Sequence, residues 1–397
     1  MKNKDYEIDH IKVLDGIRAL AIIIVVWFHF WQQSWIIPII GRVNLDFIPR
    51  YGYLLVDMLI LLSGFCLFLP YAKSMVYKEK VPDTKKFYIN RIARIIPSYL
   101  VSMVISIIFI IILSTNIPVS FFIKDTITHL TFTSNLFKDT LITTNYMVVL
   151  WSVALEVQLY LIFPFLAKKF IKHPIITYIM TVTFGILCTV LIKLIITNEN
   201  VSFWVNNTLT FIPVYANGML GAWLYIKYTK NKNRNIKKDL VFTIISIITV
   251  VIYRKICINL GADIPLIQSF QISYRFLLSC LFLIFMISTI MSHKIYRFLF
   301  ENKFMKFIAI ISFNLYIYHQ FIAVKLKELR IPFWEGDIPP NMTGDKKWMW
   351  TYFILCIVIS IVVAIIMTYL VEKPCAKRIK NANFTKKHRK KTRKCYN

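Results

Sequence analysis

Ten long apolar segments constrain this chain more than any other feature. Each holds about 20 residues with few charges, the length that an α-helix needs to cross the hydrocarbon core of a bilayer. Hydrophobic residues make up 57% of the 397-residue chain, far more than one soluble core needs. The sequence therefore predicts an all-α polytopic membrane protein, a single bundle of ten transmembrane helices. We place them near residues 14–36, 51–72, 96–114, 147–166, 174–196, 207–226, 239–257, 271–291, 305–326 and 351–371.

The positive charge of the chain bears on its orientation. The formal net charge is +28, which in a soluble protein would suggest binding to nucleic acid. Here the basic residues lie in short segments between the apolar runs, and most of the 48 lysines and arginines fall on the side that holds both chain ends. Because cytoplasmic loops carry the excess of Lys and Arg, we expect both termini in the cytoplasm. We expect membrane lipid rather than nucleic acid as a partner.

The chain divides into two parts of unequal size. We expect residues 1–372 to form one membrane domain, because no linker, low-complexity tract or internal repeat interrupts them. In residues 373–397, 11 of the 25 side chains are Lys or Arg. We expect this tail to lie in the cytoplasm against anionic lipid. The seven cysteines are an odd number and fall in helices or in the tail, so we expect neither a disulfide framework nor a metal site.

The first apolar segment carries two ionisable groups, Arg18 and His29, which are costly inside a bilayer. Their spacing of 11 residues puts them within about 20° of one helix face and about 16 Å apart along the axis. Either residue alone has a simpler explanation, because Arg18 can snorkel to the head groups and His29 can bond a backbone carbonyl. Together they predict a polar track across much of the membrane.

The second apolar segment places Asp57 at a depth similar to that of His29. We therefore expect its carboxylate to face the His29 imidazole across a helical hairpin, which would fix the tautomer and raise the basicity of the ring. Asp57 can instead lie among the head groups and cap its helix. Lys193 and Arg275 lie near the ends of their predicted helices, where we expect them to snorkel.

Glu156 lies near the middle of its predicted helix, where snorkelling cannot reach water. Ser152 and Tyr160 lie four residues to either side, so a hydroxyl, a carboxylate and a phenol share one face. We expect Trp151, Ser152 and Tyr160 to bind substrate or to support the catalytic groups. The carboxylate is therefore a candidate catalytic group.

A second polar stripe lies in the ninth apolar segment. Ser312, Tyr316 and His319 fall within about 60° of one another around the helix axis. Such groups can serve only as hydrogen-bonded contacts between helices. As a second polar stripe at membrane depth, they are candidates for substrate binding or for support of the catalytic groups.

Two arginines precede the third apolar segment. Arg91 and Arg94 are spaced at i and i+3, on one face just before Pro97, which we expect to open a helix. Two guanidinium groups so placed suit a phosphate or pyrophosphate ligand. The alternative is ordinary positive charge on a cytoplasmic loop.

These residues, in this order, carry a resemblance to a known family. The motifs are R-x10-H in LDGIRALAIIIVVWFHF, then VDMLILLSGF, RIARIIPSY, WSVALEVQLYLIFP and SFNLYIYHQFI. From about Leu14 to Glu372 the chain resembles the acyltransferase-3 family of integral membrane O-acyltransferases. One departure is that MLILLSGF replaces the aromatic-rich FF-x-LSGF of the family, although Asp57, Ser63 and Gly64 remain. We expect altered packing there rather than lost chemistry.

The resemblance implies transfer of an acyl group, usually acetyl from cytosolic acetyl-CoA, to a hydroxyl of a carbohydrate or similar acceptor. The acceptor would lie at or beyond the outer face of a bacterial cell membrane. The resemblance also implies roles for Arg18 and His29 in the acyl path and for Glu156 as an essential carboxylate. Family members often carry an external esterase-like domain, which we do not find here. We expect this chain to act alone or with a separate extracellular transferase or esterase-like protein.

A mechanism follows as an expectation. The CoA phosphates bind Arg91, Arg94 and Arg18, and His29 acts as general base on the acceptor hydroxyl or forms a transient acetyl-histidine. Glu156 would orient His29, pair with Arg18 or bind the acceptor. A proton-coupled transporter or a flippase of a lipid-linked sugar would use similar intramembrane charges. A membrane scaffold would use the helices for packing alone.

Overall fold

The computed structural model describes residues 11–113, 116–197, 199–230, 234–261 and 264–382. Ten helices in it are long and apolar enough to cross a membrane, which confirms the predicted fold class. The basic tail predicted at 373–397 lies outside the described residues from Asn383 onward. The ten long helices are α1 (Lys12–Ser34), α3 (Leu55–Tyr77), α4 (Thr84–Ile112), α7 (Leu150–Lys172), α8 (Pro174–Ile195), α10 (Thr208–Thr229), α11 (Ile236–Leu260), α12 (Ile264–Met291), α14 (Lys303–Glu328) and α15 (Lys346–Ile366).

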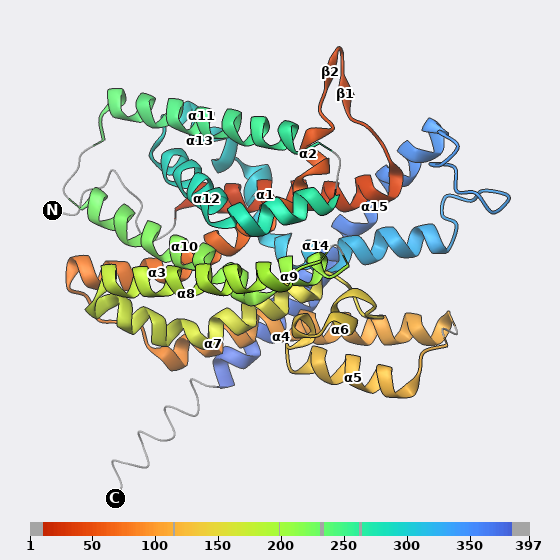
Figure 1. Ribbon diagram of the computed structural model, residues 1–397, viewed down its shortest axis with the longest axis horizontal. Coiled ribbons are helices and arrows are strands. Elements are labelled where there is room, and N and C mark those ends of the chain that lie inside the picture. Colours follow the sequence, from red (N-terminus) through yellow and green to blue (C-terminus); the bar gives the residue numbers. More distant parts are fainter. Residues whose placement is uncertain (1–10, 114–115, 198, 231–233, 262–263, 383–397) are drawn as a thin grey trace, which may run out of the picture.

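Shorter elements join the long helices. A two-stranded antiparallel hairpin follows α1, with Ile39 opposite Asn44, and it projects sideways near one end of the bundle (Figure 1). We call this the hairpin end and the opposite end, which holds Lys12 and Glu372, the Lys12 end. The short elements are β1 (Ile39–Ile40), β2 (Val43–Asn44), α2 (Phe47–Arg50), η1 (Gly52–Leu54), α5 (Val119–Leu130), η2 (Ser134–Leu136), α6 (Lys138–Ile142), α9 (Val201–Val205), α13 (Lys294–Glu301) and the π-helical turn η3 (Met367–Glu372).

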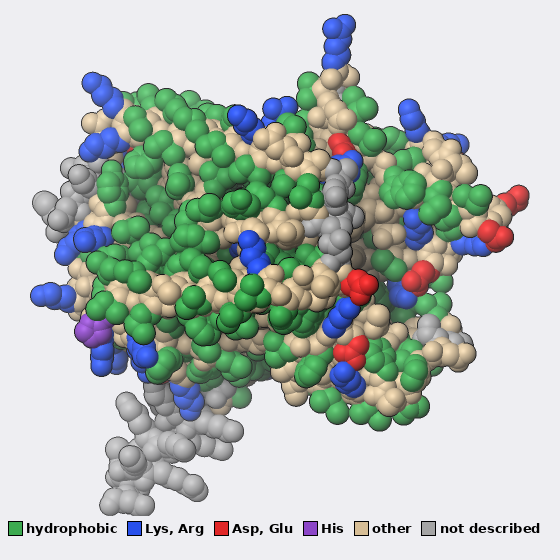
Figure 2. All heavy atoms as spheres, in the orientation of Figure 1, with side chains coloured by type: hydrophobic (Ala, Val, Ile, Leu, Met, Phe, Trp, Pro, Cys, Tyr) green, Lys and Arg blue, Asp and Glu red, His purple; other side chains and the backbone are tan. Residues whose placement is uncertain are grey.

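The surface separates charge from apolar side chains. Figure 2 shows hydrophobic side chains across the middle of the visible face, which suits contact with lipid tails. On that face the acidic side chains gather toward the hairpin end, while basic side chains occur at both ends. The positive-inside rule associates a basic end with the cytoplasm. Because basic side chains lie at both ends of this face, the cytoplasmic position of the termini stays a prediction.

Helix α4 begins earlier than predicted. It starts at Thr84 rather than near residue 96, and the Asp83 side chain accepts a hydrogen bond from the Lys85 N–H at 3.0 Å to cap it. Pro97 therefore lies inside the helix instead of opening it. All four charged residues of the helix lie in its first three turns, so a hydropathy pattern does not detect these turns. As a result, Arg91 and Arg94 are held by a continuous helix.

Helices α3 and α10 approach each other through glycine. A Cβ atom added at Gly64 would collide with the Tyr215 carbonyl oxygen, and one added at Gly218 would collide with the Leu61 carbonyl oxygen. Small residues let helix backbones pack this closely in membranes. The contact fixes α3 against the centre of the bundle and so positions its polar side chains.

Candidate active site

Two cavities inside the bundle meet beside α14. The first, of about 120 Å³, is lined by Arg18, Arg91, Arg94 and Glu156, and we call it the cationic cavity. The second, of about 270 Å³, is lined by His29 together with aromatic and amide side chains, and we call it the histidine cavity. Tyr316 and Val56 line both. All predicted site residues except Asp57 and His319 line one cavity or the other.

The cationic cavity carries an excess of positive charge. Three guanidinium groups and one carboxylate line it, and Arg18 lies 3.6 Å from Asp15 outside the lining. The Arg91 guanidinium lies over the Tyr160 ring at 5.6 Å, and its Nε is buried without a hydrogen-bond partner in the described part of the chain. A buried donor without a partner is costly. The cavity is therefore suited to an anionic ligand.

Glu156 is held by hydroxyl groups. Its Oε1 accepts hydrogen bonds from Tyr160, which lies on the same helix face as the i+4 spacing predicts, and from Ser63 of α3 at 3.1 Å. An ion pair with Arg18, one of the three roles considered for Glu156, is not formed, because the Arg18 guanidinium turns toward Asp15 and toward the Cys66 Sγ at 3.9 Å. The carboxylate instead joins α7 to α3 at the wall of the cationic cavity.

The boundary between the cavities is a pair of hydroxyl groups. The Ser152 Oγ of α7 lies 2.7 Å from the Tyr316 Oη of α14. Ser152 lines the cationic cavity and Trp151, the preceding residue, lines the histidine cavity. Ser312 also lines the cationic cavity and donates to the Ala309 carbonyl at 2.9 Å. The structure therefore brings both predicted polar stripes to the same point.

The histidine cavity has the side chains of a polyol site. Trp31, Tyr53 and Trp151 line it, together with the amide side chains of Gln268 and Gln271. The Trp31 Nε1 and the Tyr53 Oη are buried and have no hydrogen-bond partner among the residues that the structure describes. Aromatic faces beside free donors favour a ligand that is both flat-sided and rich in hydroxyls.

His29 forms a hydrogen bond with His319. The His319 Nε2 lies 2.9 Å from the His29 Nδ1, and the His319 Nδ1 lies 2.8 Å from the Tyr316 carbonyl oxygen. Because a carbonyl oxygen only accepts, the hydrogen of neutral His319 is on Nδ1 and its Nε2 is an acceptor. The His29 Nδ1 therefore donates, to His319 and to the Val25 carbonyl at 3.1 Å. The lone pair of His29 is left on Nε2.

The predicted pairing of Asp57 with His29 is wrong. The Asp57 Oδ2 lies 3.1 Å from the Arg275 Nε, and Oδ1 accepts from Gln271 at 3.2 Å. Arg275 also bonds the Thr210 hydroxyl and lies over the Phe211 ring at 3.8 Å. Asp57 lines neither cavity as described, but Gln271 and Phe211 line the histidine cavity. Asp57 is thus linked to the wall of the histidine cavity through Gln271, and through Arg275 to Phe211.

The expectation that Arg275 snorkels is also wrong. Arg275 is 2% exposed and lies well inside α12, which begins at Ile264 rather than near residue 271. Because the predicted helix began too late in the sequence, a buried arginine seemed to lie near its end. The sequence did hold a signal for this ion pair, because Asp57 and Arg275 have opposite charges, both lie in apolar segments, and each needs a partner at membrane depth. Ser63 carried no comparable signal of its own.

Comparison with known proteins agrees with this architecture. A search of curated proteins and a search of solved structures each returned no match. The family model Acyl_transf_3, described as an acyltransferase domain, matches residues 11–369, nearly the whole chain. The match includes α1, α3, α4, α7 and α14, which carry both cavities. The chain therefore belongs to the acyltransferase-3 family and is a multi-pass membrane acyltransferase.

Proposed function

We propose that the protein transfers an acetyl group from cytosolic acetyl-CoA to a hydroxyl of a cell-envelope carbohydrate. The observation that carries this proposal is the meeting of the two cavities at Tyr316. A donor in the cationic cavity and an acceptor in the histidine cavity would reach each other there. The donor would enter from the Lys12 end, in the cytoplasm, and the acceptor from the hairpin end, outside.

Charge supports CoA as the donor. The cationic cavity offers three guanidinium groups against one carboxylate. Guanidinium groups suit phosphate, with which they form charge-assisted and bidentate hydrogen bonds. In this proposal the CoA phosphates bind Arg91 and Arg94, and the pantetheine arm extends past Arg18 toward Tyr316. The thioester carbonyl would then lie at the boundary of the two cavities.

The chemistry starts from the lone pair on the His29 Nε2. The acceptor hydroxyl gives its proton to Nε2 while its oxygen attacks the thioester carbonyl carbon. The tetrahedral intermediate collapses, the carbon–sulfur bond breaks, and the CoA sulfur takes the proton from His29. The products are an acetyl ester and CoA with a free thiol. The Tyr316 hydroxyl, which accepts from the Ser152 hydroxyl at 2.7 Å at the boundary, would donate its own hydrogen to the developing oxyanion.

Radiolabelled acetyl-CoA tests this proposal directly. Protein reconstituted in vesicles would be given acetyl-CoA labelled in the acetyl group and a panel of hydroxylated acceptors such as glucosides and N-acetylglucosaminides. We expect label to move to an acceptor with release of one CoA for each ester formed. Ester formation should be lost when the acceptor is withheld, leaving at most slow hydrolysis. Intact acetyl-CoA with every acceptor would contradict the proposal.

Arg91→Ala and Arg94→Ala should each raise the acetyl-CoA concentration needed for half-maximal rate. Each substitution removes charge-assisted hydrogen bonds worth about 1.5 to 3 kcal/mol, which corresponds to roughly 10- to 150-fold in affinity. The turnover number should change less, because these groups lie on phosphates remote from the reacting carbon. Steady-state rates against acetyl-CoA concentration measure both effects. Lys86→Ala, which removes a nearby cation outside the cavity lining, is the control. An equal effect of Lys86→Ala would mean that overall positive charge, and not a phosphate site at Arg91 and Arg94, attracts acetyl-CoA.

His319 should act by setting the tautomer of His29. His319→Phe removes the acceptor for the His29 Nδ1–H, while the Val25 carbonyl still accepts from it. Loss of one hydrogen bond of about 0.5 to 1.5 kcal/mol should lower turnover roughly 2- to 12-fold and alter its pH profile. His319→Gln, which can supply an amide oxygen, should recover part of the rate. Equal loss in both variants, with an unchanged pH profile, would indicate a packing role alone.

A further inference from the structure

A third cavity, of about 480 Å³, lies between α4 and α14 and is larger than either cavity of the site. We call it the α4–α14 groove. Phe109 and Leu113 of α4 form one wall, and Gln320, Phe321 and Val324 of α14 form the other. The segment from Thr144 to Val148 closes one side. None of the preceding chemistry uses this space.

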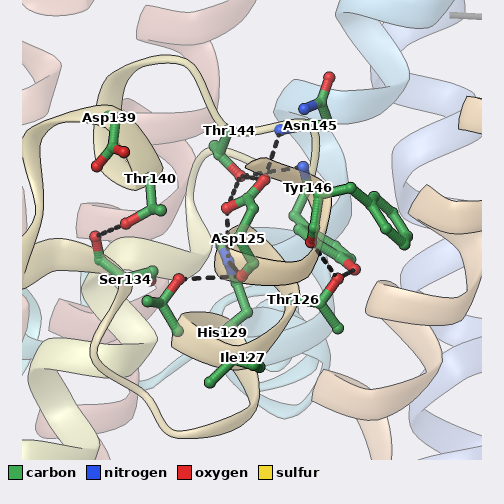
Figure 3. A network of polar contacts seen from close by, with 12 residues as sticks. Asp125, Thr126, Ile127, His129, Ser134, Asp139, Thr140, Thr144, Asn145 and Tyr146 are labelled. Atoms are coloured by element: carbon green, nitrogen blue, oxygen red, sulfur yellow. Dashed lines mark hydrogen bonds and ion pairs between the residues drawn. The ribbon is translucent and has the colours of Figure 1, made fainter. Parts of the chain in front are cut away.

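A buried carboxylate holds that segment in place. The Asp125 carboxylate of α5 accepts hydrogen bonds from the Thr144 hydroxyl at 3.1 Å and the Asn145 N–H at 3.0 Å. It also lies 3.1 Å from the His129 Nδ1, and the His129 ring packs on Tyr146 at 4.7 Å. Figure 3 shows the Thr144 hydroxyl, the Asn145 N–H and the His129 ring around the Asp125 carboxylate. The groove wall is therefore built before any ligand arrives.

The surroundings of the groove are those of a lipid-facing surface. Next to Phe109 and Leu113, the side chains of Ile111 and Ile112 are 70% and 66% exposed. Burial raises the pKa of the Tyr146 phenol, whose oxygen lies 2.7 Å from the Thr126 hydroxyl, so this wall stays uncharged at neutral pH. Apolar walls that border lipid favour a hydrocarbon chain over a water-soluble ligand.

Both ends of the groove are polar. At its outer end Lys325 and Glu328 form an ion pair at 2.7 Å. At its inner end the Gln320 Oε1 is buried and accepts no hydrogen bond from the residues that the structure describes. A buried acceptor without a partner calls for a donor such as a hydroxyl. The groove thus matches an amphiphile that carries a hydroxylated head group.

The inner end of the groove adjoins the reaction site. Gln320 follows His319 directly and lies four residues beyond Tyr316, which is one helical turn of about 6 Å on nearly the same face. Tyr316 lines both cavities of the site. A head group bonded to Gln320 would therefore lie within one turn of the boundary where transfer is proposed.

We infer that the α4–α14 groove holds the hydrocarbon chain of a lipid-anchored acceptor. The anchor lies between Phe109, Leu113, Phe321 and Val324, and the sugar extends past Gln320 into the histidine cavity. This inference rests on the proposed function, since it specifies the acceptor as a carbohydrate carried on a membrane lipid. The acceptor would thus enter sideways from the bilayer rather than from water.

A photoreactive alkyl glucoside tests the groove without requiring turnover. A hexadecyl glucoside with a diazirine at the end of its chain would be added to the protein in phosphatidylcholine nanodiscs and activated by light. We expect adducts concentrated in residues 106–113 and 320–328. Unlabelled hexadecyl glucoside should compete for them, and methyl glucoside should not. Val324→Trp and Leu113→Trp, which fill the groove from opposite walls, should each lower these adducts at least fivefold.

The matched control is Val358→Trp on α15, where the valine is 51% exposed to the lipid side and outside the groove. It should leave labelling unchanged. Adducts spread over all exposed apolar helices, without competition, would mean ordinary surrounding lipid and would overturn the inference. CoA release from acetyl-CoA, measured on the same samples, keeps the two proposals apart. Release with no groove labelling refutes the groove alone, whereas groove labelling with no release refutes the proposed acetyl transfer alone.

Discussion

His29→Ala should abolish acetyl transfer while leaving the protein folded in the membrane. The imidazole is the only base that the proposed mechanism uses, and general base catalysis contributes about 10²- to 10⁴-fold. Alanine at this position removes a polar group from a membrane helix, so insertion should not suffer. The measurement is the rate of labelled ester formation at saturating acetyl-CoA, with the amount of folded protein determined by size-exclusion chromatography.

Two further variants make this result specific. His173→Ala changes an exposed histidine between α7 and α8 and should leave the rate unchanged. His29→Lys should be as inactive as alanine, because an ammonium group near its usual pKa cannot accept a proton at neutral pH. Binding of acetyl-CoA should survive in both inactive variants, since the phosphates lie in the cationic cavity. A folded His29→Ala protein that transfers acetyl at the normal rate would remove His29 from the mechanism.

Relations within one helix could be predicted from the sequence. The spacing of Arg18 and His29 puts them on one face, and the i,i+4 spacing of Glu156 and Tyr160 gives a hydrogen bond that the structure contains. Helical periodicity is exact enough for such inferences. It also predicts that Ser312 and Tyr316 share a face, and both line the cationic cavity.

Relations between helices could not be predicted in the same way. Which helix faces α1 depends on packing, and helical periodicity does not determine packing. The sequence suggested Asp57 as the partner of His29. The structure instead pairs His29 with His319, which is distant in the chain. The similar depth predicted for Asp57 and His29 does not determine the direction in which the Asp57 side chain points. Close contact of α3 with α10 turns Asp57 toward α12 and Arg275.

Boundaries of helices limited the prediction in a second way. Charged first turns hide the start of α4 from a hydropathy pattern, and the same pattern began α12 too late. The second error changed chemistry as well as geometry, because an arginine near a helix end can reach water and one at mid-helix cannot. Arg275 therefore needed a partner that the predicted boundaries did not require.

Asp57→Leu and Arg275→Leu should each destabilise the protein strongly, and the double variant should recover most of the loss. Asp57 is fully buried and Arg275 is 2% exposed. Removing one member leaves an uncompensated buried charge that costs about 3 to 5 kcal/mol, whereas removing both is often nearly neutral. The measurement is the free energy of unfolding, from thermal or denaturant unfolding of the purified proteins in one detergent.

The exposed ion pair of Lys325 and Glu328 provides the matched control for this cycle. Its nitrogen and oxygen are 2.7 Å apart, closer than those of Arg275 and Asp57, but Glu328 is 46% exposed. Glu328→Leu should therefore change stability by less than about 1 kcal/mol.

The stable double variant of Asp57 and Arg275 should still bind its acceptor weakly, because Gln271 loses the carboxylate that orients it at the histidine cavity. Single variants as stable as the unmodified protein would show that the pair is solvated, and α12 would then have to lie differently against α3.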